Sequence, residues 1–136
     1  MSWLLDTNIV SELRKGERAN PGVRAWLAEA AEESLFTSVL VVGELRRGIE
    51  SIRRRDVPSA LALDRWLEAM TDGFADRILP IDREVAEQWG RLNVPDPVPT
   101  VDGLLAATAL VHGLTLVTRN TRDGARTGVL LLDPTA

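Results

Sequence analysis

Three acidic side chains interrupt apolar stretches of the sequence and are the first candidates for chemistry. Asp6 follows the apolar run 3–5 and is the only charged residue among the first eleven. Glu44 borders the apolar stripe of a long predicted helix, and Asp102 is the only charged residue between positions 98 and 118. An ionised carboxylate in apolar surroundings costs free energy unless it is paired, hydrogen-bonded or bound to a metal. Each acid is therefore expected to have a partner, either an arginine or a cation.

Asp123 is a fourth candidate, because it lies in a polar loop that follows a predicted strand. If a sheet brings these segments together, four carboxylates converge in a chain that has one histidine and no cysteine. Oxygen donors without nitrogen or sulfur favour a hard divalent cation such as Mg²⁺ or Mn²⁺. Such an ion activates water for phosphodiester hydrolysis. Without it, the clustered charges should raise at least one carboxyl pKa.

The elements that must position these acids alternate between strands and helices. Apolar runs at residues 3–5, 34–37, 78–81, 114–117 and 129–132 are typical of short strands, and helical patterns lie between them. This alternation predicts an α/β fold with a central parallel five-stranded sheet and helices on both faces, in one domain over residues 1–136. The carboxyl ends of such strands face a common crevice, and Asp6 and Asp123 both follow strand ends.

Two helical segments are expected to carry the other acids. The segment from residue 38 to about 54 predicts an amphipathic helix bearing Glu44, and it pairs with a second helix, which begins near Pro58 and runs antiparallel to it. The segment from Val101 to about His112 is apolar nearly all round, which is typical of a central helix covered on most sides. Thr100 is expected to cap it.

Composition limits the classes of partner and the compartment. The formal net charge of −4 argues against broad, nonspecific coating of nucleic acid, although every basic residue except Lys15 is an arginine, the residue suited to phosphate contacts. No apolar run approaches the roughly 20 residues that cross a bilayer, and no signal-peptide pattern opens the chain. We therefore expect a cytoplasmic protein without membrane contact.

Four short motifs together resemble the PIN-domain nucleases, and among them most closely the VapC-type toxins of bacterial toxin–antitoxin pairs. The resemblance runs from Trp3 to about Pro134. The motifs are Leu5-Asp6-Thr7-Asn8, Val42-Gly43-Glu44-Leu45 with the following Arg-Arg-Gly, Asp102 at the start of Leu-Leu-Ala-Ala-Thr-Ala, and Thr118-Arg119-Asn120 with Asp123.

The resemblance implies a PIN-like three-layer fold and Mg²⁺- or Mn²⁺-dependent endoribonuclease activity. It also implies a homodimer, a VapB-like antitoxin, and a possible higher hetero-oligomer of the two. Asp6, Glu44, Asp102 and Asp123 carry over as the catalytic and metal-binding quartet, with secondary positions at Thr7, Thr118, Asn120, Arg119 and Arg122. The family commonly has an aromatic residue after the fourth acid, where this sequence has Gly124.

Each acid also has an ordinary structural interpretation. Asp6 fits a helix cap, and Glu44 fits a surface pair with Arg47 on its own helix. Asp102 fits an acid favoured by the helix dipole, worth about 0.3–1 kcal/mol. Asp123 and Gly124 form a common turn dipeptide. Likewise, the arginines of the 118–123 loop either contact RNA phosphates or solvate the surface.

Two other functions remain open from the sequence. The first is a noncatalytic binding module in a DNA-bound regulatory complex, in which the acids are caps and ion pairs. The second is an aspartyl-nucleophile phosphatase in which Asp6 attacks phosphorus. That chemistry usually needs a second acid two residues on, where this chain has Asn8.

Overall fold

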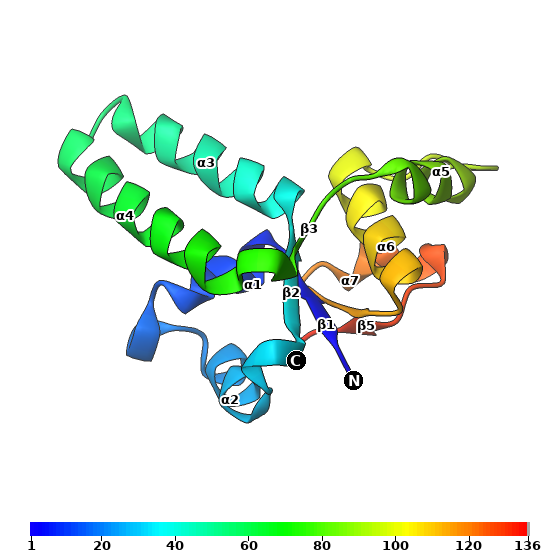
Figure 1. Cartoon of the computed structure of the whole chain (residues 1–136), viewed down its shortest axis with the longest axis horizontal. Helices are drawn as coiled ribbons and strands as arrows, with labels where there is room; N and C mark the ends of the chain where they lie inside the picture. The colour runs from blue at the N-terminus through cyan, green and yellow to red at the C-terminus, as the bar shows by residue number, and fades with distance from the viewer. Residues whose placement is uncertain (136) are drawn as a thin grey trace.

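A five-stranded parallel sheet forms the centre of the computed structural model, which describes residues 1–135 (Figure 1). Its strands lie in the order β3-β2-β1-β4-β5. The first strand is therefore in the middle, with every pair of neighbours parallel. The strands are β1 (Trp3–Leu5), β2 (Leu35–Ser38), β3 (Ile78–Leu79), β4 (Thr115–Val117) and β5 (Leu131–Leu132).

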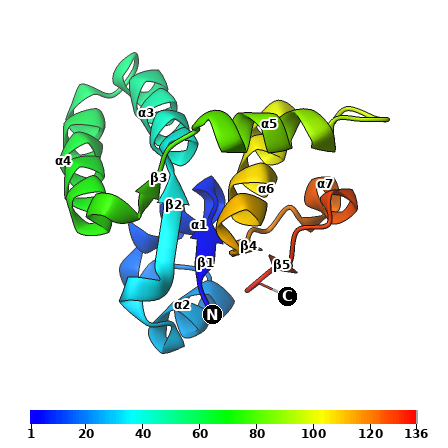
Figure 2. The ribbon, with the colours of Figure 1, turned by 45° about the vertical axis from the view of Figure 1, so that its right-hand side comes forward.

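Helices cover both faces of the sheet, as the sequence predicts (Figures 1 and 2). One face carries α1, α2 and the antiparallel pair α3–α4, while α5, α6 and α7 lie on the other. Within residues 1–135, none of these helices combines the length and apolarity that a membrane span requires. Their bounds are α1 (Thr7–Leu13), α2 (Pro21–Glu29), α3 (Val39–Arg53), α4 (Val57–Phe74), α5 (Arg83–Leu92), α6 (Thr100–His112) and α7 (Thr121–Gly124).

The core explains why these segments occupy the middle of the molecule. Leu4 and Leu5 of β1 and Val117 of β4 are completely buried, as expected of strands covered on both faces. In α6, alanines such as Ala106 and Ala109 are also fully buried and allow the helix to approach the sheet closely. The predicted central helix is confirmed, and it carries Asp102 to the edge of the sheet.

Some boundaries differ from the sequence-based prediction. Ser38, at the end of β2, caps α3 by accepting a hydrogen bond from the Leu40 amide at 3.1 Å. The prediction that Thr100 caps α6 is wrong, because Thr100 is already helical and Pro99 occupies the cap position without a side-chain bond. The Pro99 carbonyl accepts the Gly103 amide at 2.8 Å, so the backbone alone begins this helix.

Gly22, in the first turn of α2, allows the end of the chain to pack against that helix. An ideal Cβ at Gly22 would lie 2.2 Å from the Pro134 carbonyl oxygen, so Gly22→Ala must displace the backbone. We expect it to lower the free energy of unfolding by about 1–3 kcal/mol, the usual cost of overpacking, measured by urea denaturation. Gly90→Ala in α5 is the matched control, because its Cβ meets nothing within 4 Å. An equal loss in both variants would contradict this explanation.

Candidate active site

Asp6 lies where β1 ends and α1 begins, at the carboxyl edge of the sheet. Its side chain is only 7% exposed. One carboxylate oxygen accepts the Ile9 amide at 3.2 Å and so caps α1, while the other accepts the hydroxyl of Thr118, just after β4. The capping interpretation is thus correct, and it leaves room for a second role because the same carboxylate faces another strand end.

The environment of Asp6 disfavours its negative charge. Burial is the main cause that raises the pKa of this carboxyl, and the nearby charge of Glu44 raises it further. The hydrogen bonds from Thr118, Ile9 and Asn8 oppose the shift without cancelling it. A carboxylate in this position is stabilised by a positive partner, which the side chains around it do not provide.

Glu44 is brought to the same edge by α3, whose first turns pack against α1. It accepts a hydrogen bond from the hydroxyl of Thr7, which is the residue after Asp6. The alternative pairing with Arg47 does not occur, since no ion pair reaches Glu44 in the described part of the chain. Glu44 is therefore oriented by the strand–helix turn that carries Asp6.

Asp102 is half-buried in the first turn of α6. A favourable interaction with the helix dipole would lower the pKa of this carboxyl. The pKa is instead raised, first by burial and then by the negative charges of Asp123, Asp6 and Glu44. The charges of Asp123, Asp6 and Glu44 therefore act on the Asp102 carboxyl.

Asp123 is held by a residue three positions earlier. The Asn120 side-chain amide donates a hydrogen bond to the Asp123 carboxylate at 2.8 Å. Gly124 is buried, and a Cβ there would lie 3.2 Å from Leu131 Cδ2 in β5. A side chain at this position, where the family commonly has an aromatic residue, would require Leu131 to shift. Asn120 supplies the anchor for Asp123.

Glu12 is a buried acid that sequence reasoning missed. It lies in α1 with only 3% of its surface exposed and pairs with Lys15 at 3.2 Å and with Arg119 at 3.8 Å. The same signal that identified Asp102, an acid among apolar helical residues, also marks Glu12 between Val10 and Leu13.

Arg122, one of the secondary positions predicted from the sequence, is exposed on α7.

The donors at this edge fit a hard divalent cation by their chemistry. They are four carboxylates, the hydroxyl groups of Thr7 and Thr118, and the side-chain amide of Asn120. All of these groups can offer oxygen, the ligand atom that hard cations prefer. Within residues 1–135, no three acids or imidazoles are close enough to form a finished metal site. In this structure hydroxyl groups hold Asp6 and Glu44, and the side-chain amide of Asn120 holds Asp123.

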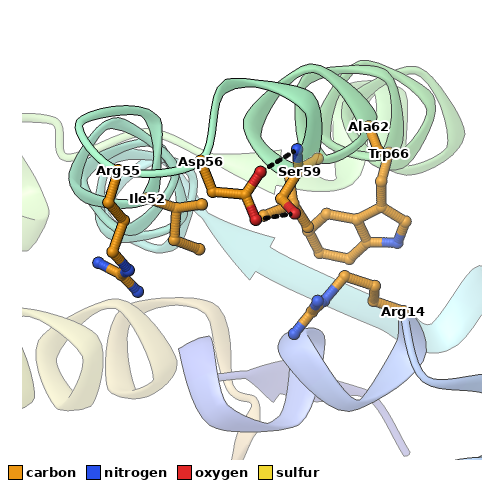
Figure 3. Close-up of a pocket in the computed structure, with 8 residues that line it drawn as sticks. Arg14, Ile52, Arg55, Asp56, Ser59, Ala62 and Trp66 are labelled. Atoms are coloured by element: carbon orange, nitrogen blue, oxygen red, sulfur yellow. Dashed lines mark hydrogen bonds between the residues drawn. The ribbon is translucent and has the colours of Figure 1, made fainter.

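A groove leads away from the acids between α1 and the α3–α4 pair. Near Thr7 and Glu44 it forms a cavity of 220 Å³, and further out it widens into one of 520 Å³. Arg14 and Trp66 line both cavities. Figure 3 shows the outer one, where Arg14 and Trp66 lie across from Arg55. An extended chain that follows this groove would pass the acidic edge.

Comparisons with known proteins extend over nearly the whole chain. The sequence matches the PIN domain family over residues 3–128. It is 32% identical over 136 residues to Toxin FitB of Neisseria gonorrhoeae, which covers 96% of each chain. It is 31% identical over 139 residues to the VapC ribonuclease Y4jK of Sinorhizobium fredii, again 96% of each.

The fold agrees with solved structures of such proteins. A crystal structure of FitAcB from Neisseria gonorrhoeae superposes with a TM-score of 0.89 at 33% sequence identity and covers 97% of both chains. A structure of FitAB bound to an IR36 DNA fragment gives a TM-score of 0.87 at 30% identity, over 98% of this chain and 96% of that one. Sequence and structure thus identify the same relatives.

Proposed function

This chain belongs to the PIN-domain family as a toxin of the VapC type, and from that premise we propose that it is an endoribonuclease dependent on Mg²⁺ or Mn²⁺. The observation that carries the proposal is the pair of hydrogen bonds that hold acids from separate elements at the end of β1: Thr118, after β4, donates to Asp6, and Thr7 donates to Glu44 of α3. Burial and the negative charges of Asp123, Asp6 and Glu44 also raise the pKa of Asp102. Carboxylates in a chain with one histidine and no cysteine suit a hard cation.

The catalytic roles in this proposal follow from how each acid is held. Asp6, Glu44 and Asp102 would hold the cation, and Thr118 fixes the orientation of Asp6. A bound Mg²⁺ or Mn²⁺ would lower the pKa of a water molecule and balance charge on the phosphoryl oxygens. Asp123 completes the ligand set or orients the attacking water, with Asn120 holding its carboxylate.

Arginines near the acids are proposed to bind the RNA backbone. Arg122 is exposed on α7 close to Asp123, and Arg14 lines the groove that begins at Glu44. Guanidinium groups form bidentate contacts with phosphate and fix the position of the strand without reading its sequence. This arrangement predicts that RNA affinity falls as the salt concentration rises.

An antitoxin is the proposed protein partner. The solved relatives include FitAB and VapBC complexes, and the groove between α1 and the α3–α4 pair starts at the acids. A VapB-like segment in this groove would block access to the site. We also propose a homodimer, with a larger hetero-oligomer when the antitoxin is bound.

Cleavage of RNA by the purified chain tests the function directly. We expect single-stranded RNA to be cut with Mn²⁺, the activity to disappear with EDTA, and excess Mn²⁺ to restore it. Glu44→Gln should lose about tenfold or more, the effect of about 1.4 kcal/mol on the barrier. The control is Glu84→Gln, which changes an exposed acid on α5 and should keep full activity. Cleavage that continues in EDTA, or that runs at the wild-type rate in Glu44→Gln, would contradict the proposal.

A second role has its own support, namely a part in a DNA-bound regulatory complex. One relative at 30% identity was solved as FitAB bound to a DNA fragment. If this chain acts only in such a complex, neither the wild-type protein nor Glu44→Gln should cut RNA. Both proteins, with the antitoxin, should shift the mobility of the DNA equally. The aspartyl phosphatase alternative loses support, because Asn8 is exposed and the family match is to nucleases.

A further inference from the structure

The loop of residues 118–120 contacts three acids from three different elements. Thr118 donates to Asp6 at the end of β1, and Asn120 donates to Asp123 in α7. Between them, Arg119 pairs with Glu12 of α1. Two of these acids belong to the proposed quartet, whereas the third lies outside it and has no role in the proposed chemistry.

We infer that Glu12 and Arg119 are positioning residues, which hold the 118–120 loop so that Thr118 and Asn120 orient Asp6 and Asp123. This inference rests on the proposed metal site. It assigns Arg119 to the support of that site and leaves phosphate contacts to other arginines.

Glu12 provides a fixed point for the loop because its carboxylate is buried and fully engaged. One oxygen accepts the Asn20 amide at 3.2 Å, and the other accepts the Lys15 ammonium at 3.2 Å. The Arg119 guanidinium approaches this second oxygen at 3.8 Å. Because the carboxylate is bound from two sides, it keeps its position when the loop moves. The ion pair therefore favours one position of the Arg119 side chain.

Arg119 interacts with acids outside the proposed quartet. In addition to Glu12, its charge acts on Asp133, whose pKa is lowered mainly by hydrogen bonds from Thr135 and further by Arg119. The guanidinium therefore lies between α1 and the segment after β5. Its side chain is 42% exposed, so the ion pair itself contributes little to folding.

The residues on either side of Arg119 are hydrogen-bonded to each other and to Asp6. The backbone amide of Asn120 donates to the Thr118 hydroxyl oxygen at 3.0 Å, and that hydroxyl donates to Asp6. A displacement of Arg119 thus changes the direction of a hydrogen bond to a proposed ligand. Groups that orient metal ligands typically affect metal affinity by about 10- to 100-fold.

Mn²⁺ binding to the protein alone tests this inference. The free Mn²⁺ signal in electron paramagnetic resonance gives the Kd without any substrate. We expect Arg119→Met and Glu12→Gln each to weaken Mn²⁺ binding by about tenfold. The double variant should lose no more than either single one, because both changes break the same pair. Arg119→Lys should recover part of the loss.

Arg65→Met is the matched control, since it removes an exposed arginine on α4, a helix that carries none of the proposed ligands. It should keep the wild-type Kd for Mn²⁺. If Arg119 instead contacts RNA, Arg119→Met would raise the KM for RNA with an unchanged Mn²⁺ affinity, and Glu12→Gln would have no effect. That result would overturn the inference while leaving the proposed function intact.

Failure of the proposed metal site would look different. Wild-type protein that binds no Mn²⁺ would overturn the proposed function, and this inference with it. If Glu12→Gln fails to fold, as judged by circular dichroism, Arg119→Met and Arg119→Lys still decide the matter, because they change a partly exposed side chain.

Discussion

Asp6→Asn is expected to abolish metal-dependent RNA cleavage and to raise the melting temperature of the metal-free protein. The activity should fall by about 100-fold or more, because loss of a ligand removes several kcal/mol of transition-state stabilisation. The fold should survive, since an asparagine oxygen can still accept the Ile9 amide that Asp6 accepts at 3.2 Å. The two measurements are an RNA cleavage assay and thermal unfolding in EDTA.

The gain in stability follows from the raised pKa of Asp6, which burial causes. The folded state binds this proton more tightly than the unfolded chain, in which the pKa is near 3.8. Ionised Asp6 thus lowers folding stability at neutral pH, and the wild-type protein regains stability as the pH falls through the folded-state pKa. Asparagine is neutral at every pH, so the variant should lack this contribution.

Asp82→Asn provides the control for Asp6→Asn. Asp82 also caps a helix, because its carboxylate accepts the Val85 amide at 3.0 Å, but it is exposed and starts α5, a helix that carries none of the proposed ligands. We expect it to retain full activity. An Asp6→Asn protein that cleaves RNA at the wild-type rate, or unfolds at a lower temperature than wild type in EDTA, would show that Asp6 is a structural cap.

Mn²⁺ or Mg²⁺ should stabilise the wild-type protein strongly. At a free concentration 100 times the Kd, a cation that binds only the folded state adds about 2.7 kcal/mol. For a domain of this size, that corresponds to roughly 5–10 °C in melting temperature. Asp102→Asn should remove most of this shift, whereas Asp76→Asn, an exposed acid distant in the sequence from the quartet, should retain it.

The stabilisation by metal should also depend on pH. Burial raises the pKa of Asp6 and Asp102, and the other acids of the site raise that of Asp102 further. Protons therefore compete with the cation, and the melting-temperature shift should shrink as the pH is lowered towards these pKa values. A shift that is independent of pH, or equal in Asp102→Asn, would mean that the cation binds elsewhere.

Much of the fold and three of the acids could be predicted because their signals are local. The alternation of short apolar runs with helical patterns predicts a parallel sheet, and the structure confirms it. Asp6 and Asp102 are conspicuous because each is a lone charge in an apolar segment, and Glu44 borders an apolar helix stripe. The absence of cysteine and the presence of only one histidine restrict the candidate donors mainly to oxygen.

The tertiary structure decided which residue contacts which. Glu44 bonds to Thr7 instead of Arg47, and Arg119 pairs with Glu12, far away in the sequence. Gly124 packs against Leu131, so the anchor of Asp123 comes from Asn120. The sheet places β1 beside β4, far away in the sequence. The hydrophobic pattern of one segment cannot predict which strand lies next to it. The sequence by itself therefore determines which types of side chain are available as donors, while the long-range packing determines which residues they contact.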